Sequence, residues 1–207
     1  MEKDKRIIFI GDSLTDCDRK ADPEQIGYGY VRLIRDQLII DDPLDFPEII
    51  NNGVNGNRVI DLAERWKEDI INLNPDYVSI SIGINDVWRQ LDNLDMEQVY
   101  TGRFKKVYHD LLQQVKSETG ASLILMEPTI IEEDEHSPGN QKLKDYVQIV
   151  RDLADEFDAL LVPTHQVFSN FISNTKHPKL TVDGVHMNSI GNVLMARTWM
   201  NTFIPRK

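Results

Sequence analysis

The sequence has a single cysteine, Cys17, among its 207 residues. A disulfide within the chain is therefore excluded, and so is a metal site built from several cysteines. Long hydrophobic runs are also missing near the start, where the charged residues 1–6 are followed only by the short apolar run 7–10. This run is too short for a signal-peptide core or a membrane span, so we expect a cytoplasmic protein with no membrane span.

Positive charge is scarce as well. The chain has 23 Lys and Arg against 34 Asp and Glu, which gives a formal net charge of -11 and a pI near 4.9. Such a surface repels the phosphates of nucleic acid and of anionic lipids. We therefore predict no nucleic-acid partner, and a neutral or cationic small molecule or oligosaccharide as substrate. The sequence does not determine the oligomeric state, and a homo-oligomer is one of the possibilities.

What the sequence does contain is a regular alternation of short apolar runs and longer segments with helical spacing. A hydrophobic fraction of 41% with 28% charged residues suits one globular domain over residues 1–207. Because parallel strands need crossover helices, the alternation predicts an α/β fold, a three-layer α/β/α sandwich around a five-stranded parallel sheet. The expected strands are 6–10, 48–50, 77–82, 122–126 and 159–162, and the expected helices are 28–40, 59–73, 96–118, 140–156 and 189–203.

Polar residues follow the first three strands, where the ligand site of such a sheet lies. Ser13 follows the first strand in Gly-Asp-Ser-Leu-Thr, Gly56 follows the second, and Asn85 follows the third. Ser13 is a candidate nucleophile, and the Asn85 amide could donate to a developing oxyanion. The alternatives are that residues 12–15 cap a helix and that Gly56 and Asn85 only form turns.

Asp183 and His186 precede the last expected helix in the segment Asp-Gly-Val-His. At this spacing one loop supplies a general base and the carboxylate that orients it. Taken alone, an Asp-x-x-His segment is weak support for catalysis. Together with the polar segments after three different strands, however, it completes the set of groups that acyl transfer needs.

These four segments, in this order, resemble the SGNH hydrolases, also called GDSL esterases and lipases. The resemblance implies a flavodoxin-like sandwich without cofactor or metal, and a triad of Ser13, His186 and Asp183. It further implies an oxyanion hole formed by the backbone N–H groups of Ser13 and Gly56 and the Asn85 side chain. The sequence departs from the family pattern in two places. Met187 replaces the proline that usually follows the histidine, and Asn57-Arg58 stand where a small hydroxyl residue is common. These departures concern the rigidity of the loops and the shape of the acyl pocket.

Within that family, residues 27–30, 61–62, 83–89 and 183–186 are similar to the branch that holds carbohydrate acetylesterases, acetylxylan esterases among them. The predicted reaction is hydrolysis of short-chain esters, O-acetyl groups on a carbohydrate in the first place. We expect Asp12, Val87 and Trp88 to contact the substrate, although Trp88 could equally be a core residue.

Three other functions stay open at this point. The first is a lysophospholipase or thioesterase with a longer acyl chain, and the second is a carbohydrate-binding protein that keeps the fold without turnover. The third is a Mg²⁺-dependent aspartyl-phosphate phosphatase, which residues 12–15 resemble superficially. Leu14, however, stands where such an enzyme needs its second aspartate.

The remaining histidines are expected to be surface or loop residues without metal-ligand spacing. They are His109, His136, His165 and His177. Residues 127–139 are expected to form a loop after the fourth strand, either a flap that faces the substrate or a solvated surface loop.

Overall fold

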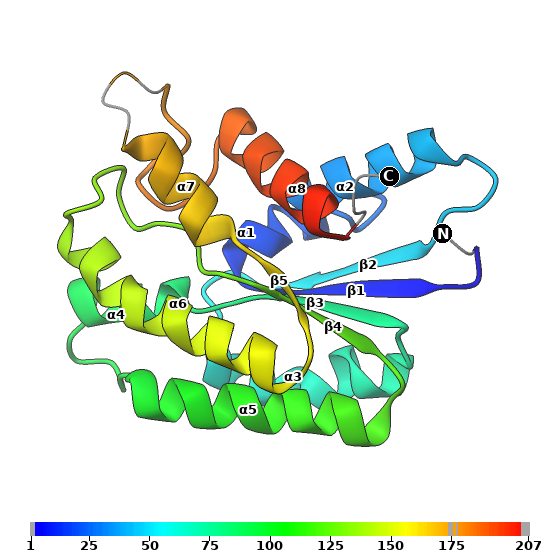
Figure 1. Cartoon of the computed structure of the whole chain (residues 1–207), viewed down its shortest axis with the longest axis horizontal. Helices are drawn as coiled ribbons and strands as arrows, with labels where there is room; N and C mark the ends of the chain where they lie inside the picture. Colours follow the sequence, from blue (N-terminus) through cyan, green and yellow to red (C-terminus); the bar gives the residue numbers. More distant parts are fainter. Residues whose placement is uncertain (1–2, 174–175, 177, 204–207) are drawn as a thin grey trace.

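The computed structural model describes residues 3–173, 176 and 178–203 (Figure 1). Its centre is a five-stranded sheet in the order β2-β1-β3-β4-β5, in which every neighbouring pair is parallel. This confirms the predicted sheet, and the order is the flavodoxin-like one. The strands are β1 Arg6–Gly11, β2 Glu48–Gly53, β3 Tyr77–Ser81, β4 Ser122–Met126 and β5 Leu160–Val162.

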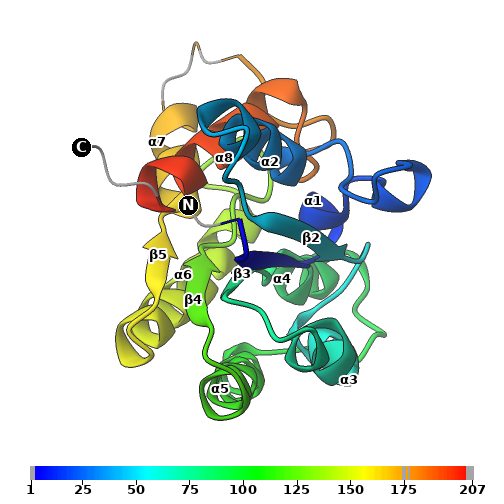
Figure 2. The same ribbon diagram turned by 90° about the vertical axis from the view of Figure 1, so that its right-hand side faces the viewer.

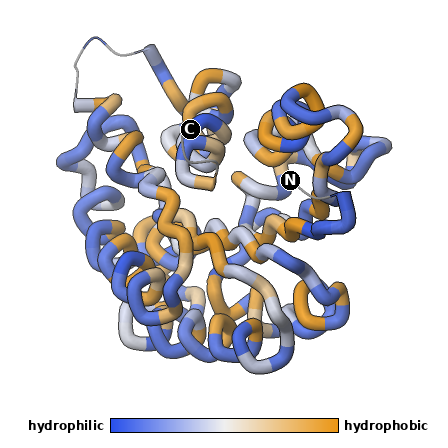
Figure 3. The backbone as a smooth tube through the Cα atoms, turned by 45° about the vertical axis from the view of Figure 1, so that its right-hand side comes forward, coloured by the Kyte–Doolittle hydropathy of each residue, from blue (hydrophilic) through white to orange (hydrophobic). Residues whose placement is uncertain are grey.

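The strands form because their apolar residues are covered on both faces of the sheet. All four residues of the short run 7–10 in β1 are fully buried, as are Val78 and Ile80 of β3. Figure 3 shows these strands as a hydrophobic centre surrounded by helices with mixed surfaces. A near-continuous apolar run is typical of a strand buried on two sides.

Helices cover the two faces of the sheet. Helices α2, α7 and α8 lie on one face and α3, α5 and α6 on the other, which confirms the three-layer sandwich (Figure 2). The α-helices are α1 Ser13–Asp16, α2 Tyr30–Asp41, α3 Val59–Asp69, α4 Ile84–Asp92, α5 Thr101–Glu118, α6 Pro138–Glu156, α7 Thr164–Ile172 and α8 Ser189–Phe203, with short 3₁₀ turns at Arg19–Ala21 and Ile71–Leu73. No helix within the described part of the chain is long and apolar enough to cross a membrane.

The structure differs from the predicted elements in several places. Three helices were not predicted, namely α1, α4 and α7, because each is short and begins within or beside a turn-forming segment. The expected helix over 59–73 stops at Asp69, and the one over 96–118 begins only at Thr101. The strand β2 continues through two asparagines to Gly53, because the buried Asn51 side chain donates hydrogen bonds to the carbonyls of Thr15 and Ile26.

The carboxyl ends of β1, β2 and β3 meet at one edge of the sheet. In register, Gly11 pairs with Gly53 on one side and with Ser81 on the other. The chain leaves β1 toward β2 and later returns to the opposite side as β3, so this edge is the switch point of the topology.

Two glycines allow α1 to pack directly on this edge. A Cβ on Gly11 would lie 2.5 Å from Thr15 Oγ1, and one on Gly53 would lie 2.1 Å from the Asp16 nitrogen, both in α1. Neither position has room for a side chain, so the glycines fix how close Ser13 lies to the strand ends.

Candidate active site

The first residue of α1, Ser13, meets a loop that is 173 residues away in the sequence. Its Oγ lies 2.9 Å from His186 Nε2, and His186 Nδ1 lies 2.6 Å from Asp183 Oδ2. An ionised carboxylate only accepts, so Nδ1 carries the proton, and Nε2 is left as an acceptor for the Ser13 hydroxyl. The structure thus brings together the serine, histidine and aspartate that were predicted to act jointly.

The Asp183–His186 segment is a tight turn held by its own aspartate. Asp183 Oδ1 accepts hydrogen bonds from the backbone nitrogens of Val185, at 3.0 Å, and His186, at 2.8 Å. Partial burial works to raise the pKa of Asp183, but the bonds from the His186 side chain and the two backbone groups outweigh it and lower the pKa. Asp183 is therefore ionised at neutral pH, as a partner for an imidazolium must be.

Residues 127–137 form the predicted loop, which reaches back to the histidine turn. One oxygen of Glu133 accepts hydrogen bonds from the Leu180 nitrogen at 3.0 Å, the Thr181 nitrogen at 2.8 Å and the Thr181 hydroxyl. The Glu132 nitrogen also donates to the Gly184 carbonyl at 2.7 Å. The loop is therefore a brace for the turn that carries Asp183 and His186. This role of Glu133 could not be predicted from the sequence, because Glu133 lies in a run of similar acids.

The loop after β2 lies beside the helix that follows β3. Gly56 has a φ of +78° in this loop, which favours glycine. The Asn85 side-chain amide donates to the Asn57 carbonyl at 3.1 Å and so ties the loop to α4. Its second N–H group has no acceptor in the described part of the chain. Within the described residues, the backbone N–H groups of Ser13 and Gly56 donate no hydrogen bond. Three donors are therefore available at the sheet edge where Ser13 lies.

A buried carboxyl stands on each side of this edge. Asp86, which is fully buried on α4, accepts from the Val59 nitrogen at the start of α3 with both oxygens, at 3.1 and 3.2 Å. Asp12 accepts from the Leu14 nitrogen and caps α1, while its second oxygen is buried without a partner among the described residues. Burial raises the pKa of Asp86 to about 8 and that of Asp12 to about 7.

These raised pKa values make folding stability fall as pH rises. An aspartate in the unfolded chain loses its proton near pH 4, whereas Asp86 in the folded protein keeps its proton up to about pH 8. The folded state therefore holds more protons than the unfolded state across this window, and the free energy of unfolding decreases through it. We expect Asp86→Asn to shrink the difference in melting temperature between pH 5 and pH 8.5 by roughly 5–10 °C.

Differential scanning fluorimetry at the two pH values measures this effect. The matched control is Asp155→Asn, which removes an exposed carboxyl of α6 and should leave the pH difference as in the parent. An Asp86→Asn protein with an unchanged pH difference would show that Asp86 is ionised in the folded state.

Two of the three residues expected to contact substrate are placed elsewhere by the structure. Val87 has no exposed surface and belongs to the core of the helical layer, so it cannot line a pocket that opens to solvent. Asp12 is 1% exposed and serves as the cap of α1, the alternative considered from the sequence. Trp88 is half-buried beside the site, with its ring centroid 5.9 Å from that of His186.

The other histidines also differ in part from the expectation. His109 lies on the surface of α5, as expected, with Nε2 3.2 Å from a Glu156 oxygen. His165 differs from the expectation because it lies partly buried on α7. His136 is exposed in the 127–137 loop, as expected. His177 lies outside the described residues. Among the described residues, no group of three or more His, Cys, Asp or Glu side chains could hold a metal ion.

A parallel α/β/α sandwich with a hydrogen-bonded serine, histidine and aspartate at its switch point is the arrangement expected of an SGNH hydrolase. The profile of the GDSL-like Lipase/Acylhydrolase family matches residues 9–194, and the chain belongs to this family. It is accordingly an esterase.

Within the family, the chain is similar to an acetylxylan esterase of Geobacillus stearothermophilus, at 36% identity over 95% of this chain and 92% of that protein. The crystal structure of an acetylxylan esterase from the same organism superposes with a TM-score of 0.90, at 34% identity, covering 100% of this chain and 98% of that one. Solved catalytic mutants of that esterase replace a serine, an aspartate or a histidine by alanine. LAE5, an alpha/beta hydrolase enzyme from the metagenome of Lake Arreo, has a TM-score of 0.89 and 30% identity over 98% of this chain and 96% of its own.

Proposed function

We propose that this esterase hydrolyses O-acetyl groups on carbohydrates through an acyl-serine intermediate, with residues 1–207 acting as one domain. The observation that carries the chemistry is the continuous hydrogen-bond chain from Ser13 through His186 to Asp183. The substrate rests on the similarity to acetylxylan esterase over nearly the whole length of both chains.

In the acylation step, His186 Nε2 takes the proton of the Ser13 hydroxyl as its oxygen attacks the ester carbonyl. Asp183 keeps the imidazole in the required tautomer and stabilises the imidazolium that forms. The Ser13 and Gly56 N–H groups and the free N–H of Asn85 donate to the oxyanion. His186 then gives its proton to the departing alcohol oxygen, and an acyl-serine remains.

In the deacylation step, the same groups act on water. His186 removes a proton from a water molecule as its oxygen attacks the acyl-serine, and it returns that proton to Ser13 Oγ when the acid leaves. Trp88 lies beside His186 and is proposed to form one wall of the acyl pocket. An aromatic wall close to the base favours a small acyl group over a long one.

The substrate proposal is tested by comparing kcat/KM over two series. The first is acetyl, butyryl and octanoyl p-nitrophenyl esters, and the second is acetylated xylo-oligosaccharides against an acetyl thioester. We expect acetyl to be preferred in the first series and the acetylated oligosaccharides in the second. A preference for octanoyl would contradict the acetylesterase proposal and favour an enzyme for longer acyl chains.

The brace formed by Glu133 gives a further prediction. Replacing Glu133 by alanine removes the acceptor for three hydrogen bonds to Leu180 and Thr181, which loosens the turn that carries His186. Because small displacements of a catalytic group are costly, we expect kcat on p-nitrophenyl acetate to fall about 10- to 100-fold, with KM changed much less.

Two further variants separate positioning from a general loss of stability. Glu133→Gln keeps an acceptor oxygen and should recover most of the activity. Glu132→Ala removes a neighbouring exposed acid whose carboxylate makes no hydrogen bond among the described residues, while its backbone bond to the Gly184 carbonyl is kept, so it should behave as the parent does. Equal loss of kcat in Glu132→Ala and Glu133→Ala would show that the brace does not depend on the Glu133 carboxylate.

A further inference from the structure

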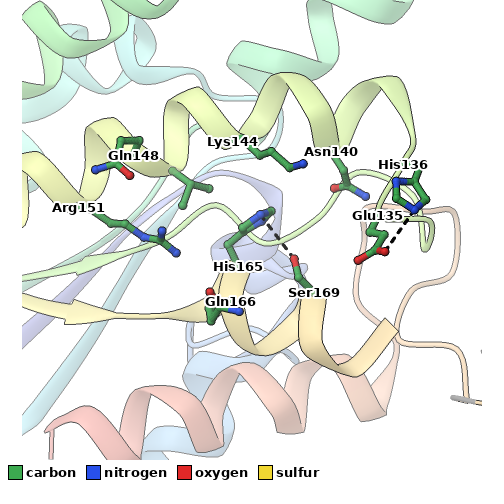
Figure 4. Close-up of a pocket in the computed structure, with 10 residues that line it drawn as sticks. Glu135, His136, Asn140, Lys144, Gln148, Arg151, His165, Gln166 and Ser169 are labelled. Atoms are coloured by element: carbon green, nitrogen blue, oxygen red, sulfur yellow. Dashed lines mark hydrogen bonds and ion pairs between the residues drawn. The ribbon is translucent and has the colours of Figure 1, made fainter. Parts of the chain in front are cut away.

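A polar cavity of about 490 Å³ lies between α6 and α7. Its volume falls within the range of small-molecule sites, and none of the residues assigned above to the esterase site lines it. Figure 4 shows side chains from the two helices projecting toward the space between them. The lining residues are Glu135, His136, Asn140, Lys144, Val147, Gln148, Arg151, His165, Gln166 and Ser169.

The charge of this cavity is opposite to that of the protein. The chain carries a formal net charge of -11, yet the lining includes two permanent cations, Lys144 and Arg151, and one acid, Glu135. Glu135 Oε1 lies 3.3 Å from His136 Nε2, where the 127–137 loop closes one end of the cavity. Lys144 and Arg151 are seven residues apart on α6, which places them roughly 10 Å apart along one side of the helix. Two cations against one acid in the lining favour an anionic ligand over a cationic one, although the Glu127 carboxylate that pairs with Arg151 offsets part of this charge.

Arg151 is held in place from behind. Its Nε donates to an oxygen of Glu127 at 2.6 Å, and the Glu127 side chain is completely buried. The second Glu127 oxygen accepts from the Gln166 nitrogen at 3.0 Å, so this carboxylate is fully used inside the protein. The two Nη groups of Arg151 have no hydrogen-bond partner among the described residues. They form a fork whose geometry matches a carboxylate or a phosphate.

The opposite wall presents a hydrogen-bond acceptor. His165 Nδ1 lies 2.6 Å from the Thr129 carbonyl oxygen, which only accepts, so Nδ1 carries the proton. Burial lowers the pKa of His165, so the ring is neutral at pH 7 and Nε2 is an acceptor. Nε2 lies 3.5 Å from the Ser169 hydroxyl, and the pair faces Arg151 across the cavity (Figure 4). Such a pair is suited to ligand hydroxyl groups.

We propose that this cavity is a second binding site, for a small hydroxylated anion such as a sugar acid or a sugar phosphate. The anionic group binds the Nη fork of Arg151, hydroxyl groups bind His165 and Ser169, and Lys144 contacts the other end of the ligand. The site is separate from Ser13 and does not depend on the esterase proposal.

Isothermal titration calorimetry tests the site with D-glucuronate, glucose 6-phosphate and, as the neutral comparison, D-glucose. We expect at least one of the two anions to bind with a Kd below about 10 mM and at least about tenfold more tightly than glucose, with affinity that falls as salt is added. The anion that binds more tightly shows whether the site prefers a carboxylate or a phosphate. Binding of glucose as tight as that of both anions, or no binding of either anion, would overturn the proposal.

The variants are chosen so that the protein still folds. Arg151→Lys keeps a cation beside the buried Glu127 but loses the fork, and we expect it to weaken binding about fivefold or more. Lys144→Gln should weaken it about threefold, whereas Lys142→Gln, an exposed lysine of α6 outside the cavity, should have no effect. Unchanged affinity in both Arg151→Lys and Lys144→Gln would overturn the assignment.

A Ser13→Ala protein should bind the anion with the same Kd as the parent. Loss of binding in this variant would place the ligand in the esterase site and would also overturn the second site. An inactive parent that still binds the anion would instead contradict only the esterase proposal.

Discussion

Replacing Ser13 by alanine should lower kcat on p-nitrophenyl acetate roughly 10⁴- to 10⁶-fold, because the variant has no hydroxyl to form the acyl-enzyme. His186→Ala should cost a similar factor, since Ser13 would then lack the base that its Oγ contacts at 2.9 Å. The effects of substituting residues that act as a unit on kcat are not additive, so the double variant should be no slower than either single variant. Steady-state kinetics on the three purified proteins measures this pattern.

The Ser13 side chain is half-buried at the start of α1, and among the described residues its hydroxyl makes one hydrogen bond, with His186. The variant should therefore melt within about 2 °C of the parent, which separates lost chemistry from lost folding. If the double variant were slower than either single variant by the product of their separate losses, Ser13 and His186 would be acting independently.

The second large effect is expected at Asn85. Asn85→Ala removes one of the three donors proposed for the oxyanion and should lower kcat about 10²- to 10³-fold, with a much smaller change in KM. The selective effect on kcat follows because the oxyanion forms only in the transition state.

Asn52→Ala is the matched control for Asn85. Asn52 is a partly buried asparagine near the end of β2 whose amide donates to the Asp69 carbonyl at 2.8 Å, so its loss removes a similar bond without touching the proposed hole. We expect its kcat to stay within about threefold of the parent. A fall in kcat of the same size in both variants would mean that Asn85 acts through packing of the loops and not through the oxyanion.

The sheet could be predicted from the sequence because buried parallel strands leave a strong pattern. The apolar run over residues 7–10 and the run that became β4 are nearly continuous, and turn-forming residues bound each of them. The short helices α4 and α7 left no comparable pattern. In α4, Gly83 and Asn85 indicate a turn, while the burial of Val87 and Asp86 that stabilises the helix depends on distant elements.

The site was partly predictable for a similar reason. Ser13, Asn85, Asp183 and His186 have side chains whose chemistry is evident from their type. Ser13 and Asn85 follow strands, and Asp183 and His186 precede the last helix. Glu133 and Glu127 are acids like many others in this chain, and their roles follow from partners 47 and 24 residues away. Val87 was misplaced because adjacency to Asn85 in sequence does not determine which way a helical side chain points.

The measurement that tests the account most directly is trapping of the acyl-enzyme. Wild-type protein mixed with p-nitrophenyl acetate and quenched in acid should gain the mass of one acetyl group, and peptide mapping should place that group on Ser13. Labelling by a fluorophosphonate should likewise occur in the parent and vanish in Ser13→Ala. Acetylation or labelling that persists in Ser13→Ala, or maps to another residue, would contradict the assignment of Ser13 as the nucleophile.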